Sequence, residues 1–208
     1  MIRGHRLTDD FSFACLNCAF AKAIATTHLL PSVHHFEFNR SHQIPTYPTA
    51  PQNFVSIENS RRYQTLPLWL VLTTTQDLCN APKTPTHPNG DPEGEYFKCH
   101  SGDLTQVFGT WRRLGLSERD ANDTPFTQSI MDYWVSFART HDPNPDPAYL
   151  KARGYVNTTA QVEASGRWEA VREVEPTMRY LQCPSRQQPM GRDVQCEALG
   201  LGVDYFLS

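Results

Sequence analysis

Proline is the residue that most restricts how this chain can fold. The sequence holds 16 prolines against 11 glycines, and eight of the prolines fall between positions 45 and 92. Because proline fixes φ and lacks an amide donor, it interrupts helices and sheet ladders alike. We therefore expect a loop-rich chain with few long regular elements, and no regular structure between residues 41 and 92.

The composition is that of a globular protein and excludes several classes of partner. The chain has 208 residues, enough for one domain, and 39% of them are hydrophobic. Its net charge is −3 and it has no run of lysines or arginines, so we expect no nucleic-acid face. No apolar stretch approaches the ~20 residues needed to cross a bilayer, so we expect no membrane span. Residues 1–15 lack the pattern of a signal peptide.

Two segments near the N-terminus are expected to be regular. Residues 9–27 predict a helix that begins at Asp9 and Asp10. Its apolar face would comprise Phe13, Leu16, Phe20, Ala23 and Ile24. Residues 33–39 alternate well enough for a strand, in which Phe36 and Phe38 would share one side and His34 and His35 would serve packing.

The clearest helix signal covers residues 124–140. Thr124 can cap the helix and Pro125 suits its first position. Its apolar face, which we interpret as core packing, comprises Phe126, Ile130, Tyr133 or Trp134, and Phe137. A short strand is predicted at residues 166–171, around Trp168, and the tail at 196–207 is expected to dock on the main body.

The six cysteines do not predict a metal site or a cofactor. Cys15 and Cys18 have the C-x-x-C spacing, but Cys183 and Cys196 are too far apart to supply the second half of a zinc site. A thioredoxin-like motif would need a strand before it, and none is predicted there. Glycosylation sequons occur at Asn39, Asn122 and Asn157, and with the cysteines they favour a secretory environment.

One histidine stands in the setting of a catalytic imidazole. His100 lies between a cysteine and a Ser-Gly-Asp turn, and an apolar run follows. A neutral imidazole on a loop is the usual general base for a serine hydroxyl. Asp103 could orient that loop by accepting backbone amides, but it is a poor candidate for the acid of a catalytic triad. The chain has no Gly-x-Ser-x-Gly elbow, so a structural histidine remains the alternative.

A family resemblance favours the catalytic interpretation. The run Tyr-Phe-Lys-Cys-His-Ser-Gly-Asp-Leu at 96–104, followed by Val-Phe-Gly-Thr, resembles the catalytic-histidine segment of the type-B carboxylesterases. These enzymes form the cholinesterase and fungal-lipase branch of the α/β-hydrolases. Further segments resemble the family in the same order along the chain: 8–15, 35–40, 131–145, 153–159 and 195–205. The resemblance covers most of residues 7–40 and 77–208.

The resemblance implies both a fold and an activity. The chain, residues 1–208, would be the C-terminal part of an α/β-hydrolase fold with few strands of its own. His100 would act as general base and then general acid on a small-molecule carboxylic ester, without a cofactor, in a secreted enzyme. The family's serine elbow, oxyanion-hole glycines and triad acid are expected upstream of residue 1. The chain alone should therefore be inactive.

Disulfide bonds are expected between Cys79 and Cys99, which would restrict the His100 loop, and between Cys15 and Cys196. Cys18 and Cys183 would then remain outside disulfides.

The chain also departs from the family pattern. Leu16 stands where proline is usual, Cys183 stands where the fungal members have tryptophan, and residues near 42–61 resemble an insertion. The segment Arg-Ser-His-Gln-Ile-Pro at 40–45 is echoed by Arg-Tyr-Gln-Thr-Leu-Pro at 62–67, and either copy could continue the strand before it. We hypothesise that about twenty residues there come from translated non-coding sequence or from a faulty gene model. Two further alternatives are a non-catalytic binding module derived from the esterase fold and a fragment that does not fold stably.

Overall fold

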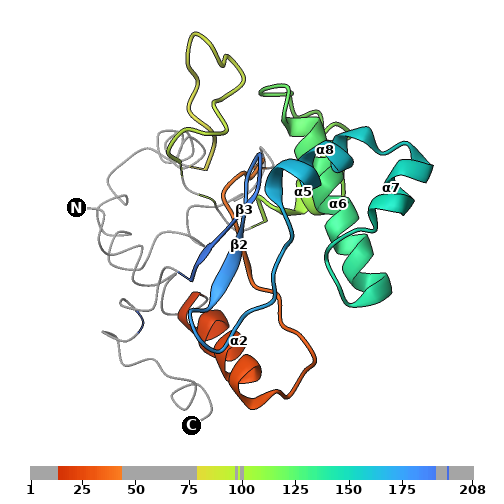
Figure 1. Ribbon diagram of the computed structural model, residues 1–208. Coiled ribbons are helices and arrows are strands. Elements are labelled where there is room, and N and C mark those ends of the chain that lie inside the picture. Colours follow the sequence, from red (N-terminus) through yellow and green to blue (C-terminus); the bar gives the residue numbers. More distant parts are fainter. Residues whose placement is uncertain (1–13, 44–78, 97, 99–100, 191–195, 197–208) are drawn as a thin grey trace, which may run out of the picture. The chain divides into compact units, whose positions relative to one another are not determined.

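The computed structural model describes residues 14–43, 79–96, 98, 101–190 and 196 (Figure 1). The chain divides into two compact units, which are described separately. The first unit comprises residues 1–37, 165–181 and 185–208, and the second comprises residues 38–164 and 182–184.

The first unit contains a helix and a small sheet. Helix α2 spans Cys15–Thr27, and the strands are β1 (Phe36–Phe38), β2 (Thr177–Leu181) and β3 (Arg186–Pro189). The sheet has the order β1-β2-β3, and β2 and β3 pair antiparallel, with Thr177 opposite Pro189. Helix and hairpin residues meet in one core cluster: Cys18, Ala21, Val171, Met178 and Met190.

Helix α2 agrees with the predicted helix from Cys15 onward, whereas Asp9, Asp10 and Phe13 lie outside the described residues. The predicted apolar face is only partly buried, since Leu16, Ala23 and Ile24 are half-buried. The helix buries Cys15, Cys18 and Ala21, while Phe20 is exposed. Small side chains at these positions let the helix approach its neighbours closely, and the disulfide of Cys15 fixes which side faces inward.

Strand β1 lies within the predicted segment 33–39, and its neighbourhood is aromatic. Phe36 and His34 both meet Trp168 edge-on, with ring centroids 5.8 Å and 6.2 Å apart. His34 therefore serves packing, as expected. The predicted strand around Trp168 is not formed, and residues 166–171 have an irregular backbone. The Val171 amide donates a hydrogen bond to the Val33 carbonyl, just before β1, at 2.7 Å.

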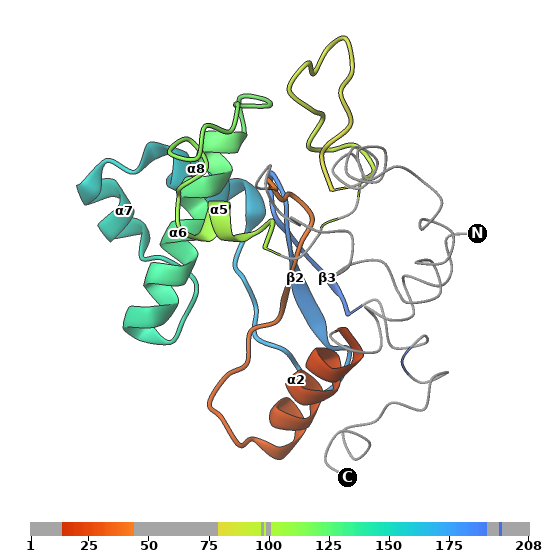
Figure 2. The same ribbon diagram turned by 180° about the vertical axis from the view of Figure 1, so that it is seen from behind.

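The second unit is helical. Its elements are α5 (Leu104–Val107), α6 (Asp123–Thr140), α7 (Pro147–Arg153) and α8 (Val156–Ser165). Both views show α5 and α8 beside α6 (Figures 1 and 2). The Thr158 hydroxyl of α8 donates to the Asp132 carboxylate of α6 at 2.5 Å. Helix α7 has a well-formed N-cap, in which the Asp146 carboxylate accepts the Ala148 amide at 2.8 Å.

Helix α6 confirms most of the strongest helix prediction. Phe126, Ile130 and Tyr133 are buried, as the spacing predicts. Two details are wrong. Asn122, not Thr124, occupies the N-cap position. Phe137 is 46% exposed, although its ring lies edge-on to that of His141.

The described residues have the predicted fold class in its coarse form: mixed α and β, rich in loops, with three short strands. Residues 79–96 consist of turns and irregular backbone, which matches the expectation from their prolines. Residues 44–78 and the tail at 197–208 lie outside the described part of the chain. None of the described helices is both long and apolar enough to cross a membrane.

Candidate functional site

The predicted catalytic residue and one of its neighbours, His100 and Cys99, lie outside the described residues, as does Phe97. The backbone resumes at Ser101, whose φ of +69° begins a tight turn. The Leu104 amide donates to the Ser101 carbonyl at 3.3 Å, and helix α5 follows directly. Asp103 supports this turn through its backbone carbonyl, which accepts the Gln106 amide at 2.9 Å. Its carboxylate makes no capping hydrogen bond to α5, and its predicted role toward the His100 loop involves residues outside the described part of the chain.

The segment that follows β1 contacts both flanks of this stretch. The Tyr96 hydroxyl donates to the Ser41 carbonyl at 2.9 Å. The His42 amide donates to the Gly102 carbonyl at 2.9 Å, and the Thr105 hydroxyl donates to the His42 carbonyl at 2.9 Å. Residues 41 and 42 therefore bind the chain on either side of position 100.

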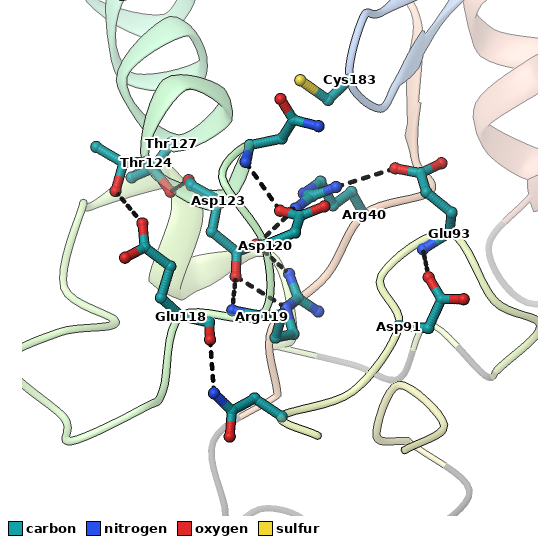
Figure 3. Close-up of polar contacts among 12 residues, drawn as sticks. Arg40, Asp91, Glu93, Glu118, Arg119, Asp120, Asp123, Thr124, Thr127 and Cys183 are labelled. Carbon is teal, nitrogen blue, oxygen red and sulfur yellow. Dashed lines mark hydrogen bonds and ion pairs between the residues drawn. The ribbon is translucent and has the colours of Figure 1, made fainter. Parts of the chain in front are cut away.

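A cluster of five charged side chains, here called the arginine cluster, surrounds the same segment (Figure 3). Its members are Arg40, Glu93, Arg119, Asp120 and Asp123. Arg40 is fully buried and contacts all three carboxylates, with distances of 2.9 Å to Glu93 and 2.9 Å to Asp123. Arg119 binds Asp123 at 2.8 Å and donates a further hydrogen bond to the Ser41 carbonyl at 2.6 Å.

The electrostatics of the cluster favour fixed charges. Burial alone would raise the pKa of Asp123, but hydrogen bonds and charge from Arg119, together with the charge of Arg40, outweigh it and lower the pKa. Burial would likewise lower the pKa of Arg40, and Asp123 and Asp120 reverse that effect and raise it. A buried charge is costly unless it is paired, and here each buried charge is paired. Arg40 and Asp123 therefore remain charged at neutral pH, and we interpret the cluster as a structural framework.

His42 is buried beside this cluster and is a poor proton carrier. It is 9% exposed, and its ring lies 5.7 Å from that of Trp111. Burial, and then the charges of Arg119 and Arg40, lower its pKa to about 4. The imidazole is consequently neutral at physiological pH, and its function is packing.

The other described histidines also lack the geometry of a catalytic relay. His35 lies against the Cys18 thiol, and burial lowers its pKa. His87 has hydroxyl and carboxylate neighbours, but Thr84, Thr86 and Asp91 all approach the same ring nitrogen, Nδ1. A relay needs one partner at each nitrogen. His28 and His141 are exposed residues that end helices α2 and α6.

One predicted disulfide is present among the described residues. Cys15 and Cys196 are joined, with Cα atoms 5.4 Å apart. Cys79 is also disulfide-bonded, and its predicted partner, Cys99, lies outside the described part of the chain. Cys18 and Cys183 are not in disulfides, as expected. The Cys183 thiol donates to the Gln161 amide oxygen at 3.2 Å, and burial raises its pKa, so it is not an activated nucleophile.

The three sequon asparagines have different surroundings. The Asn122 side chain is exposed at the start of α6. The Asn157 amide donates to the Gln128 side chain at 2.7 Å at the surface. The Asn39 amide donates to the Gln182 side chain at 3.2 Å, and the sequon hydroxyl of Ser41 is buried. Only the first of these settings leaves the asparagine amide open for a glycan.

The arginine cluster and Thr105 were not predicted from the sequence. Their signal would have been weak, because Arg40 lies 83 positions from Asp123 and ordinary surface charges occur at similar spacing. The local pair of Arg119 and Asp123, four residues apart before a helix, is the one clue that the sequence offers. No group of three or more metal-binding side chains comes together within the described residues.

The likeness of this chain to known proteins depends on short motifs. No family model matches the chain, and no curated protein matches it. The resemblance to the type-B carboxylesterases therefore rests on the sequence segments given above alone.

Proposed function

We propose that this chain is the C-terminal part of a serine carboxylic-ester hydrolase similar to the type-B carboxylesterases, and that His100 is its proton-transferring imidazole. His100 takes the proton from a serine hydroxyl as the oxygen attacks the ester carbonyl, and returns it to the leaving alcohol. The serine, the oxyanion hole and the acid are contributed by another stretch of polypeptide. The substrate is a small-molecule ester, no cofactor is needed, and the enzyme is secreted.

The observation that carries this proposal is the anchoring of the backbone on both sides of position 100. Tyr96 is bonded to Ser41, and Gly102 is bonded to His42, at 2.9 Å in each case. A general base is effective only when its reactive nitrogen is held close to the productive geometry. The anchored backbone at Tyr96 and Gly102 supports the proposal, because a catalytic histidine between them would need fixed flanks.

The surroundings of the other histidines support the same assignment by contrast. His42 has a pKa of about 4 and is buried against Trp111, so it cannot act as a base at neutral pH. His34 and His35 pack within the first unit. None of these three histidines is therefore an alternative to His100 for the catalytic role that the sequence motif predicts.

The first test is the transcript upstream of the codon for residue 1. The proposal expects an in-frame sequence that encodes Gly-x-Ser-x-Gly and the oxyanion-hole glycines. A transcript that begins at residue 1 and is strongly expressed would contradict it.

The second test is hydrolysis of p-nitrophenyl acetate by the longer protein. We expect turnover that falls about 10³-fold or more in the His100→Ala variant, because general-base catalysis contributes roughly 10²–10⁴-fold. The matched control is His87→Ala, which removes an imidazole from a loop in the same unit and should change kcat less than twofold. The chain of residues 1–208 alone should show no turnover, and turnover that depends on His100 in that chain would overturn the need for a second polypeptide.

A non-catalytic interaction module is the second candidate function, and one observation favours it. Helices α5 and α6 and the residue that follows α5 expose several large apolar side chains, among them Leu104, Phe108, Met131 and Val135. Gly109, which follows Phe108, lies directly against the sulfur of Met131, so two of these side chains are on neighbouring elements. Exposed apolar residues on adjacent elements are typical of a protein contact surface. Abundant expression of the chain without an upstream hydrolase segment would favour this module.

A further inference from the structure

A thiol, a disulfide and an imidazole meet at the first turn of helix α2. Cys15 and Cys18 both lie in this turn, and Cys15 is bonded to Cys196. Cys18 is not in a disulfide, and both helix cysteines are buried. His35 belongs to the same compact unit as the three cysteines. The C-x-x-C spacing noted in the sequence therefore places a disulfide sulfur and a thiol on one turn.

Helix geometry brings the two sulfurs of this turn together. Residues three positions apart share one face of an α-helix, with Cβ atoms about 5–6 Å apart, and their side chains tilt toward the N-terminus. The backbone of α2 therefore directs the Cys18 side chain back toward Cys15. A disulfide needs Cβ atoms about 3.5–4.5 Å apart. Tightening of the first turn by roughly 1–2 Å would let Cys18 bond to Cys15 in place of Cys196.

His35 supplies a proton acceptor for the thiol of Cys18. Its Nε2 lies 3.9 Å from the Cys18 Sγ. Burial lowers the pKa of His35, and the charge of Glu37 only partly opposes that effect. The imidazole is therefore neutral at physiological pH, and in the tautomer with its proton on Nδ1 it accepts a proton at Nε2. Because the thiolate, and not the thiol, attacks a disulfide, such an acceptor is what a buried thiol needs to react.

Cys183, the other described thiol, has a different neighbour. It donates a hydrogen bond to the Gln161 amide oxygen at 3.2 Å, and an amide oxygen does not take up the proton of a thiol at neutral pH. Cys183 also belongs to the second unit, whereas the disulfide of Cys15 belongs to the first. Among the described thiols, Cys18 is therefore the one with both a disulfide and a base at hand.

We propose that Cys15, Cys18 and His35 form an intramolecular thiol–disulfide exchange site that releases Cys196 from helix α2. His35 takes the proton of Cys18, and the resulting thiolate attacks the sulfur of Cys15. The bond from Cys15 to Cys196 breaks, and its electron pair leaves on the Cys196 sulfur, which then takes the proton. The number of disulfides is unchanged, so the step needs neither an oxidant nor a reductant. This inference is independent of the proposed esterase activity.

The exchange would change how the chain is connected. It replaces a bond across 181 positions with one across three. The structure contains the long-range bond, so the form with Cys15 bonded to Cys18 is the minor one. A reagent that captures the released thiol draws the equilibrium toward the minor form by mass action. Position 196 is half-buried, whereas Cys18 is 6% exposed, so the released thiol is the more accessible of the two.

The test is disulfide mapping of residues 1–208 in a Cys183→Ser background, in which Cys18 is the one thiol outside the disulfides. The folded protein is incubated with N-ethylmaleimide for longer than the minutes to hours of an uncatalysed disulfide rearrangement. It is then quenched with acid and digested with trypsin without reduction. Trypsin yields one peptide with both cysteines of α2, 7–22, and another with Cys196, 193–208.

We expect most alkylated molecules to carry maleimide on peptide 193–208 and an internal disulfide in peptide 7–22. Maleimide on Cys18 with the bond to Cys196 intact would overturn the proposal, as would exchange of Cys18 with the disulfide of Cys79. The matched control adds Cys18→Ser to the same background and should leave Cys196 unlabelled. Labelling of Cys196 in that control would overturn the assignment of Cys18 as the attacking thiol.

Replacement of His35 distinguishes exchange in the folded protein from exchange in the unfolded chain, where the position of this imidazole is irrelevant. His35→Gln should slow the labelling of Cys196 at pH 7 about tenfold or more, since general-base catalysis contributes roughly 10²–10⁴-fold. His28→Asn replaces an exposed histidine at the end of the same helix and should change the rate less than about twofold. Equal rates in His35→Gln and the original chain would overturn the role of His35. The mapping result does not depend on this variant.

Discussion

Arg119, in the irregular segment before α6, and Asp123, the first residue of that helix, are joined by three hydrogen bonds. The Asp123 carboxylate accepts the Arg119 backbone amide at 2.7 Å, its Nε at 3.2 Å and its Nη2 at 2.8 Å. The same carboxylate also binds Arg40, which comes from the segment after β1. Asp123 is therefore the one group that holds both buried guanidinium groups of the helical unit's ion-pair framework.

Replacement of Asp123 should destabilise the protein more than replacement of any surface charge. In Asp123→Asn, two buried guanidinium groups lose their shared carboxylate, and the expected loss is about 3–5 kcal/mol of unfolding free energy. Chemical denaturation monitored by tryptophan fluorescence measures it. The control is Glu118→Gln, which breaks the exposed pair with Arg112 and should cost at most about 1 kcal/mol. Equal losses in the two variants would show that the buried framework is not stabilising.

His42 should make the fold sensitive to mild acid. Its pKa is about 4 in the folded chain and 6.5 in the unfolded chain, so between these values the unfolded state binds more protons. Stability should therefore fall as the pH decreases from 6.5 toward 4, by up to roughly 3 kcal/mol from this residue.

The His42→Gln variant should lose less stability than the original chain across the same interval, measured by denaturation at pH 7, 5.5 and 4.5. The control is His141→Gln, which replaces an exposed histidine at the end of α6. An identical slope in His42→Gln and the original chain would contradict the burial of this imidazole. His35, whose pKa burial also lowers, contributes in the same direction and remains in both variants.

Local sequence signals predicted the helix better than the site. Pro125 and the spacing of Phe126, Ile130 and Tyr133 identified α6, because a helix that packs on one side repeats its apolar residues every three to four positions. The prediction that Phe137 is buried was wrong, because apolar residues can continue their helical spacing beyond the part of the helix that packs on the core. For α2, the pattern favoured large residues, whereas the structure buries the small side chains of Cys18 and Ala21.

Features that depend on distant partners were not predictable in this way. The strand residues Arg186–Pro189 carry no alternation of apolar and polar side chains, so β3 had no sequence signal. Arg40 would be assigned to the surface by composition, yet it is fully buried because three carboxylates from two later segments meet it. Its role follows only from the fold, since no local pattern links it to Asp123.

The three sequons should differ in occupancy when the chain passes through a eukaryotic secretory pathway. Asn122 should carry a glycan in most molecules, because its side chain is exposed. A glycan on Asn39 is incompatible with the described structure, since that amide is bonded to Gln182 and the Ser41 of its sequon is buried. Mass mapping of secreted, folded protein after enzymatic deglycosylation measures each site. High occupancy at Asn39 in folded protein would contradict the placement of the segment after β1.

The state of the cysteines is the most direct check of the chain's connectivity. Cys15 is bonded to Cys196 and Cys79 is in a second disulfide, whereas Cys18 and Cys183 are thiols. Thiol titration of the denatured, non-reduced protein should therefore detect two reactive groups among the six cysteines. In the folded protein, Cys183 should react before Cys18, because it is only half-buried.

Removal of the bond between Cys15 and Cys196 should be costly, since it closes a separation of 181 residues in the unfolded chain. The Cys196→Ser variant should lose about 2–5 kcal/mol of stability. Its control is Cys183→Ser, which removes a thiol that is in no disulfide and should lose less than about 1 kcal/mol. A fully reduced chain as stable as the oxidised one would show that the disulfides do not support this fold, and would leave the secretory assignment without its structural basis.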